Sequence, residues 1–159
     1  GELLKQLPQN GGQFTTYADY AQAELSDILT GSQLKAAEKL AVNETATLMF
    51  LSSPKGYVQA PLPQEIQYAP IYAFCYQDFD EDGVKDLLAA GNNSYTKLRL
   101  GYMEGNCGLL MKGLGNGKFK SLSPQNSGLS IRGSVRDLIL IDRELWLISN
   151  EVPLQAYTY

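Results

Sequence analysis

The chain has 159 residues, of which 44% are hydrophobic and 19% are charged. A chain of this length can hide about 70% of its extended surface in one folded domain, and no apolar run approaches the ~20 residues of a bilayer-spanning helix. Thirteen Lys and Arg against seventeen Asp and Glu give a net charge of −4, the wrong sign for binding a phosphate backbone. We therefore expect a globular protein with no nucleic-acid partner and no membrane insertion within this chain.

Two residue types limit the chemistry further. The sequence contains no histidine, which excludes Ser-His-Asp and Cys-His catalysis and histidine-ligated zinc unless another chain supplies the imidazole. Its two cysteines, Cys75 and Cys107, are too few for a disulfide scaffold or a four-thiolate zinc site. They either form one disulfide or each fill an apolar position in a strand, and the second arrangement is favoured because buried free cysteine is common.

The first part of the chain predicts a pair of helices. Between residues 14 and 29 apolar side chains recur at helical three-four spacing, with Thr16 as a candidate N-cap and Gly31 as a stop. A second, shorter helix is expected after Ser32. Its apolar side chains fall on one side: Leu34, Ala37, Leu40 and Ala41. We interpret residues 1–44 as a helical lead-in or insertion whose apolar stripe packs on the rest of the protein.

From residue 45 onward the pattern changes to short β-like runs separated by Gly, Pro and Asn. The expected strands cover residues 45–51, 56–60, 71–76, 86–90, 108–112, 118–122, 135–141 and 145–149. Two tight hairpin turns are expected at residues 53–56 and 115–118, the second through an Asn-Gly pair that favours positive φ. The predicted fold class is mainly β, built from short antiparallel strands.

An internal repeat runs through these strands. Residues 48–63 match residues 109–124 at an offset of about 61, and residues 86–92 match residues 144–150. A repeat built from four short strands is typical of β-propeller blades. Residues 45–159 therefore predict about two blades, and because a complete propeller has at least four, we expect this chain to be part of a larger one or of an assembly.

One run of acidic residues carries candidate chemistry. Aspartates stand at relative positions 1, 3, 5 and 9 of this run: Asp78, Asp80, Asp82 and Asp86. Gly83 at position 6 permits a sharp turn, and the carbonyl of Val84 at position 7 would face inward. Hard oxygen ligands without His or Cys favour calcium over zinc or copper.

An EF-hand begins in the same way but differs at two points. Its loop needs a bidentate Glu at position 12, which is Ala89 here, and a helix on each side. The flanking segments, residues 71–76 and 87–90, are strand-like. The run is therefore interpreted as the turn of a β-hairpin, in which a metal would neutralise four clustered acids.

At this point the sequence resembles a known family. The pattern Asp-x-Asp-x-Asp-Gly-x-x-Asp-Leu at residues 78–87, the glycine-rich run at 113–119 and the passage at 133–138 resemble the FG-GAP/VCBS repeat of integrin-alpha-like β-propellers. The tail resembles the C-terminal portion of large bacterial VCBS-repeat proteins. The helix around residues 17–21 resembles a helical insertion in those proteins.

The resemblance implies a calcium-binding, non-enzymatic scaffold located outside the cytoplasm: secreted, periplasmic or on the cell envelope. It implies calcium ligands from Asp78, Asp80, Asp82 and Asp86 and from the carbonyl of Val84. The second repeat has only residues 142–144 where a calcium loop would lie, so a short metal-free hairpin is expected there.

Two other functions are weighed beside the scaffold. An enzyme would have to use carboxylates such as Glu65, Glu104 or Glu144, or the aspartate run itself, whose crowded acids do not suit the ~5–9 Å separation of glycosidase carboxylates. A carbohydrate-binding module or an accessory part of a glycan-processing protein would use some of the ten tyrosines. The partner is thus a protein or a glycan, and uncovered blade faces and edges are expected to favour self-association.

Overall fold

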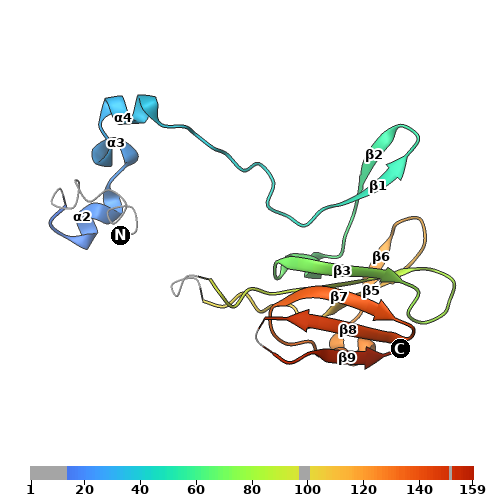
Figure 1. The fold of residues 1–159 in the computed structure, drawn as a ribbon. Coiled ribbons are helices and arrows are strands. Elements are labelled where there is room, and N and C mark those ends of the chain that lie inside the picture. The colour runs from blue at the N-terminus through green and yellow to red at the C-terminus, as the bar shows by residue number, and fades with distance from the viewer. Residues whose placement is uncertain (1–13, 97–100, 151) are drawn as a thin grey trace. The chain divides into compact units, whose positions relative to one another are not determined.

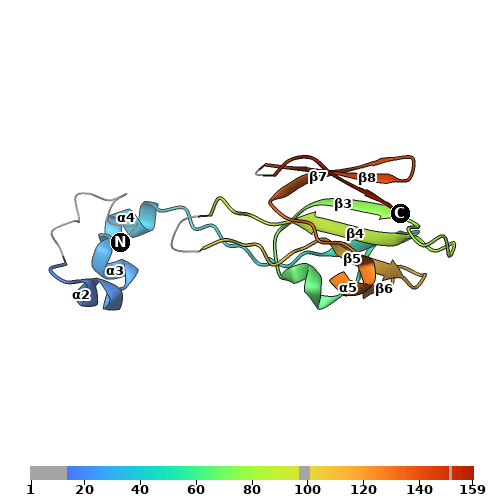
Figure 2. The same ribbon diagram turned by 90° about the horizontal axis from the view of Figure 1, so that it is seen from below.

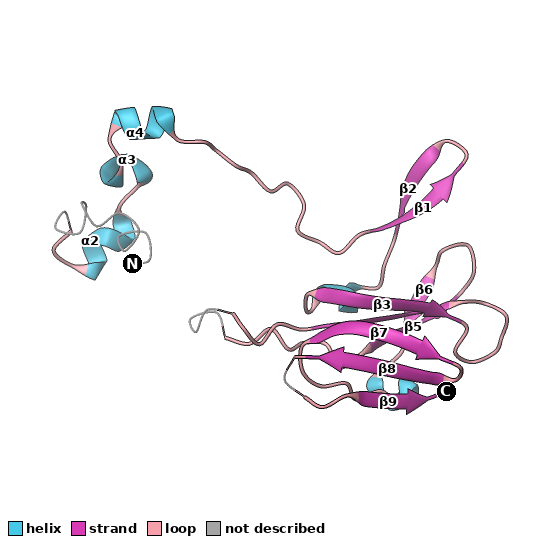
Figure 3. Ribbon diagram, viewed as in Figure 1, coloured by secondary structure: helices cyan, strands magenta, loops and turns pink. Residues whose placement is uncertain are grey.

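A computed structural model describes residues 14–96, 101–150 and 152–159. The chain divides into two compact units, Gly1–Glu44 and Thr45–Tyr159. The described part is mainly β, with nine strands in three antiparallel sheets and only short helices (Figures 1 and 3). The predicted fold class is confirmed.

The described residues of the first unit contain three short helices, and the helix expected over residues 14–29 is divided in two. Helix α2 spans Tyr17–Gln22 and helix α3 spans Leu25–Ile28. Between them, Ala23 has extended backbone with ψ of 135°, and Glu24 opens α3 with a capping box. The apolar spacing is continuous across this point, but the local capping hydrogen bonds start a new helix.

Helix α4 spans Gly31–Ala36, and Thr30 caps it by accepting a backbone N–H with its hydroxyl. Gly31, expected to end the preceding helix, is instead the first residue of α4. The backbone leaves the helical region at Ala37, where ψ is 133°. The expected second helix is therefore shorter than predicted, and the last three positions of its apolar side, Ala37, Leu40 and Ala41, lie beyond its last residue. In the described residues no helix is long and apolar enough to cross a membrane.

All strands of the described residues lie in the second unit. In chain order they are β1 (Met49–Ser53), β2 (Gly56–Ala60), β3 (Ile71–Gln77), β4 (Asp86–Gly91), β5 (Leu109–Gly113), β6 (Phe119–Ser121), β7 (Val135–Ile141), β8 (Glu144–Ser149) and β9 (Gln155–Thr158). The sheets have the strand orders β1-β2, β3-β4-β5-β6 and β7-β8-β9, with every neighbouring pair antiparallel. A short 3₁₀ helix, η2 (Gln64–Gln67), and a short helix α5 (Pro124–Ser127) lie in the connections.

The first expected strand begins later than predicted. Its opening residues around Thr47 are not in a strand, and β1 starts at Met49. The side chain of Gln67 takes the place of a neighbouring strand: its oxygen accepts the Thr47 N–H at 2.8 Å and its amide donates to the Thr47 carbonyl at 2.9 Å. An amide side chain offers the same donor and acceptor pair as a backbone, so this segment is satisfied without sheet pairing.

The sequence repeat crosses the boundaries between sheets. Hairpin β1-β2 corresponds to β5-β6, and hairpin β3-β4 corresponds to β7-β8, but β3-β4 pairs with β5-β6 to form the one four-stranded sheet of the described residues. A four-stranded sheet between a two-stranded and a three-stranded sheet is consistent with part of a propeller. Each repeat thus contributes two strands to one sheet and two to the next.

The equivalent hairpins β3-β4 and β7-β8 also share a β-bulge or similar irregularity in their strand register. In each hairpin the register shifts near the start of the first strand, at Tyr72 in β3 and at Arg136 in β7. The two extra residues meet, since the Arg136 guanidinium lies over the Tyr72 ring at 4.1 Å. This cation–π contact joins the four-stranded sheet to the three-stranded sheet, which lies along one of its faces (Figure 2).

The hydrophobic core lies on both faces of the four-stranded sheet. Between it and the three-stranded sheet, Leu88 and Ala90 of β4 pack with Val135 and Leu147 of β7 and β8, all at most 1% exposed. On the opposite face Met111 packs with Ile66 and Ala89, at most 3% exposed. Strand β4 is buried on both faces, which fits its nearly continuous apolar sequence.

The cysteines are not paired. Cys75 lies in β3, where burial raises the pKa of its thiol. Cys107 is exposed in a bend before β5 and is not in a strand. The expectation of free cysteines is met, whereas the strand position expected for Cys107 is wrong. Asn106 donates its backbone N–H to the side chain of Asn92, and the carbonyl of Cys107 accepts the N–H of Ile131, so this segment does not enter the sheet.

Candidate metal centre

The aspartate loop, residues 78–86, connects β3 to β4 in the four-stranded sheet. The last residue pair of the β3-β4 hairpin is Gln77 with Asp86, so eight residues separate the paired ends. Two of them need left-handed backbone: Glu81 has φ of 59° and Gly83 has φ of 86°. Glycine adopts this conformation at no steric cost. The chain therefore curls into a compact loop rather than extending away from the sheet.

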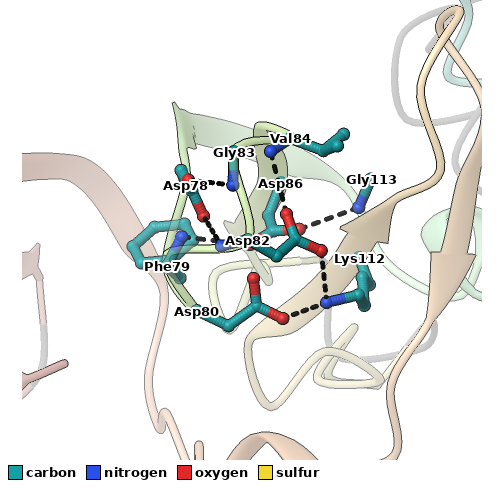
Figure 4. A network of polar contacts seen from close by, with 9 residues as sticks. All are labelled: Asp78, Phe79, Asp80, Asp82, Gly83, Val84, Asp86, Lys112 and Gly113. Carbon is teal, nitrogen blue, oxygen red and sulfur yellow. Dashed lines mark hydrogen bonds and ion pairs between the residues drawn. The ribbon is translucent and has the colours of Figure 1, made fainter.

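Backbone amides within the loop bond to its own carboxylates (Figure 4). Asp78 accepts from the N–H of Asp82 at 3.2 Å and from the N–H of Gly83 at 2.8 Å. Asp82 in turn accepts from the N–H of Val84 at 2.8 Å. These bonds are turns of the kind that short acidic side chains favour, and they hold the side chain of Asp78 inside the curl.

Asp86 anchors the loop to the sheet. Its residue is 2% exposed, and its two carboxylate oxygens accept from the N–H of Phe79 at 3.0 Å and from the N–H of Gly113 at 2.8 Å. The second bond reaches from β4 to the end of β5. A buried carboxylate needs such donors, so Asp86 fixes the loop entrance against the neighbouring strand.

The hydrogen bond from Gly113 to Asp86 requires the backbone of Gly113 to lie very close to the backbone of Lys85. A Cβ atom added there would lie 2.2 Å from the carbonyl oxygen of Lys85, a separation that no side chain tolerates. The sequence shows Gly113 only as part of a turn-rich run, and its contact with the loop comes from the antiparallel pairing of β4 with β5.

Three carboxylates converge in this arrangement. Asp78, Asp80 and Asp86 each offer one oxygen, and these oxygens lie within 4.8 Å of one another. Calcium binds oxygen at about 2.3–2.6 Å, so two ligands on opposite sides of one ion lie up to roughly 5 Å apart. The three oxygens therefore fit around a single hard cation, and the described residues can hold a metal ion at this loop.

The other two expected ligands are not part of this group. One oxygen of Asp82 accepts the N–H of Val84, and the other lies 2.8 Å from the ammonium of Lys112. Asp82 therefore lies beside the convergence point and faces a lysine. Val84 takes part through its N–H, and its expected use as a carbonyl ligand stays a prediction.

Lys112 is the main participant that the sequence reasoning missed. Its ammonium contacts both Asp80 and Asp82 (Figure 4). The hydrogen bonds that the ammonium donates to these two carboxylates raise the pKa of Lys112 above its ordinary value. In the other direction, the bond from Lys112, followed by the Val84 N–H, lowers the pKa of Asp82. An ion pair 30 residues apart leaves no local sequence signal, and only strand pairing shows it.

The β7-β8 hairpin is closed by a tight turn in place of a long acidic loop. The last pair of β7-β8 is Ile141 with Glu144, which leaves a two-residue turn in which Asp142 has φ of 53°. The expected short hairpin is what the structure contains. Arg143 in this turn forms an ion pair with Glu81 of the aspartate loop, so the tips of the two hairpins touch.

The carboxylates considered for an enzyme lie apart from the metal cluster. Glu65, Glu104 and Glu144 are exposed residues of η2, of a connection and of β8. Glu104 accepts from the hydroxyl of Ser94 at 2.8 Å, and Glu144 accepts from the indole of Trp146 at 3.0 Å. Among the described residues, none of the three belongs to a group of metal-ligating side chains.

Two hollows accompany the site. A cavity of about 420 Å³ opens beside the loop and is lined by Asp80, Asp86 and Lys112 together with leucines of β4 and β5. An apolar groove of about 460 Å³ lies between the β1-β2 hairpin and the opposite face of the four-stranded sheet. Phe74 and Tyr76 line this groove and are 71% and 54% exposed.

Comparisons of the chain with protein-family models, with curated proteins and with solved structures found no match.

Proposed function

We propose that this chain is a calcium-stabilised β-propeller segment of an extracytoplasmic protein, which acts as a non-enzymatic scaffold for binding a protein or another ligand. The observation that carries the proposal is the convergence of Asp78, Asp80 and Asp86 within 4.8 Å at a loop with the 1-3-5-9 aspartate spacing. The similarity of that loop to the FG-GAP/VCBS repeat supports the same interpretation.

The donor set favours calcium among the common metals. All candidate ligands are oxygens of carboxylates or of the backbone, the type that calcium prefers, whereas zinc and copper favour nitrogen and sulfur. Bound calcium would supply positive charge that offsets the repulsion among the aspartates. The residues of this chain then do the structural work: Asp86 ties the loop to β5, and Asp78 holds its curl.

A structural rather than catalytic use of the metal is supported by the residues around it. The chain has no histidine, and the loop carries no hydroxyl or thiol nucleophile next to a base. An extracytoplasmic location agrees with a site of modest affinity, with a dissociation constant on the order of 10⁻⁴ to 10⁻³ M as in extracellular calcium modules.

Isothermal titration with calcium tests the proposal. Wild-type protein is expected to bind one ion, and Asp80→Ala is expected to lose binding because it removes one of the three converging ligands. Glu144→Ala is the control: it removes an exposed acid at the start of β8, outside the converging group, and should bind as the wild type does. The proposed calcium site is contradicted if binding is unchanged in Asp80→Ala, or if the wild type does not bind at about 10 mM calcium.

A second candidate function is carbohydrate binding, favoured by the exposed aromatics of the apolar groove. Phe74 and Tyr76 alternate along β3 and face the same side, and aromatic faces of this kind pack against sugar rings. A glycan array would show binding that is lost in Phe74→Ser but kept in Asp80→Ala assayed in calcium. No glycan bound above background would remove this candidate and leave a protein partner.

A further inference from the structure

Lys112 brings a positive charge of the chain itself to the aspartate loop. It lies in β5, and its ammonium contacts a carboxylate oxygen of Asp80 and lies 2.8 Å from one of Asp82. Both carboxylates belong to the loop, 30 and 32 residues earlier in the chain. Lys112 therefore connects the outer side of the loop to the strand that also receives Asp86.

The other cations near the loop are engaged elsewhere. Lys85 lies over the ring of Tyr76 at 5.3 Å, and Arg143 pairs with Glu81, which is not among the converging ligands. In the described part of the chain, the ion pairs of the candidate ligands Asp80 and Asp82 are made with Lys112. One ammonium thus offsets part of the charge of four aspartates.

Asp80 contacts Lys112 and also belongs to the group of three converging carboxylates, Asp78, Asp80 and Asp86. One of its oxygens is within the group that fits a cation, and its Oδ2 contacts Lys112. An ammonium and a divalent ion repel each other at short range, so both cannot occupy the Asp80 carboxylate without cost. The side chain of Lys112 is 34% exposed and lines the cavity of about 420 Å³ beside the loop, so it has space into which it can move.

We propose that Lys112 is an internal counter-ion that holds the aspartate loop closed in the absence of metal, and that a metal ion has to displace it from Asp80 and Asp82. Lys112 thereby sets the metal affinity of the loop below the value that the aspartates alone would give. This inference rests on the proposed calcium site. It assigns to Lys112 a positioning role and a competing role, and no ligand role.

The matched control is Lys120, which lies directly opposite Lys112 in the β5-β6 pairing. Opposite residues of an antiparallel pair project from the same face of the sheet, so Lys120→Met removes the same charge at a nearby place. Lys120 is exposed, and its removal reports the general effect of lost positive charge. The difference between Lys112→Met and Lys120→Met then isolates the contacts with Asp80 and Asp82.

Calcium titration of the three proteins is the first test. We expect Lys112→Met to bind calcium about three- to tenfold more tightly than wild type, the range that one or two exposed ion pairs provide. Lys120→Met should differ from wild type by less than about twofold, since long-range interactions between exposed charges are largely screened by salt. A lysine with only a structural role would show the opposite sign, because a loosened loop binds metal more weakly. Equal affinities of the two variants, or weaker binding by Lys112→Met, overturn the inference.

Thermal melting in chelator is the second test and does not need a bound metal. We expect Lys112→Met to melt at a lower temperature than Lys120→Met, because its loop then has neither ammonium nor ion. Equal melting temperatures overturn the closing role of Lys112. If none of the three proteins binds calcium, the metal proposal and the displacement step both fail, and the melting comparison in chelator still decides whether Lys112 closes the loop.

Discussion

The hairpins β3-β4 and β7-β8 are two versions of one structural unit with different tips. Both contain a seven-residue first strand and a register shift near its start. The first hairpin ends in the eight-residue segment between Gln77 and Asp86, and the second ends in a two-residue turn between Ile141 and Glu144. The strands therefore do not need the long loop in order to pair.

The difference teaches what the aspartate loop requires. A two-residue turn with one left-handed residue, Asp142, closes a hairpin by backbone geometry alone. The longer loop gathers four acids, and it is held by Asp86, by the amides that bond Asp78 and by Lys112. The repulsion among like charges in such a loop has to be offset by positive charge or by hydrogen-bond donors. A bound metal ion would supply part of that positive charge.

The first residues of β4 and β8 should respond most differently to substitution. Asp86 is buried and accepts two backbone N–H groups, whereas Glu144 at the matching position is exposed. Asp86→Ala leaves both donors without an acceptor and should lower the free energy of unfolding by about 2 to 6 kcal/mol, at about 1 to 3 kcal/mol for each buried donor. Glu144→Ala should stay within about 0.5 kcal/mol. Urea unfolding of both variants in chelator measures this contrast, and equal effects would show that Asp86 does not anchor the loop.

A smaller effect is expected where the loop touches β5. Gly113→Ala places a Cβ 2.2 Å from the Lys85 carbonyl, and the strand has to move away at a cost of about 1 to 3 kcal/mol. The matching position of the first repeat is Ser52 in β1, where a side chain is already present. Urea unfolding should show destabilisation by Gly113→Ala and almost none by Ser52→Ala. An unchanged midpoint for Gly113→Ala would contradict the close approach.

The smallest effect is expected at the contact between the hairpin tips. Glu81 and Arg143 form an ion pair with side chains 68% and 61% exposed, and exposed pairs contribute about 0.2 to 1 kcal/mol. Glu81→Gln should therefore change the unfolding free energy by less than about 1 kcal/mol, and the change should shrink in high salt. A larger loss that persists in 1 M salt would mean that the two tips depend on each other more than the exposed pair explains.

Sequence periodicity predicts the strands well and the helices less well. Strands β2 and β7 have the predicted bounds, and most of the others differ by one or two residues. The prediction of one continuous first helix is wrong at Glu24, where a capping box starts a new helix within a continuous apolar stripe. The predicted start of the first strand is wrong around Thr47, where the side chain of Gln67 forms the hydrogen bonds that a neighbouring strand would form. In both places a specific hydrogen bond outweighs the general pattern.

The candidate site could be predicted in part for a related reason. The spacing of Asp78, Asp80 and Asp86 is local in the sequence, and the structure brings these three together. Lys112 could not be predicted because it reaches the loop only through the pairing of β5 with β4. The pairing of β4 with β5 was likewise hidden, since the repeat runs across two sheets and its period does not show which strands are neighbours.

Melting of the wild type in calcium and in chelator tests the central claim most directly. With a dissociation constant of about 10⁻⁴ to 10⁻³ M, calcium at about 10 mM should stabilise the fold by about 1.4 to 2.7 kcal/mol, which corresponds to a rise in Tm of roughly 3 to 11 °C. Asp80→Ala should melt at a lower temperature than wild type in calcium and show no rise of its own. Equal Tm values of the wild type with and without calcium would contradict the account.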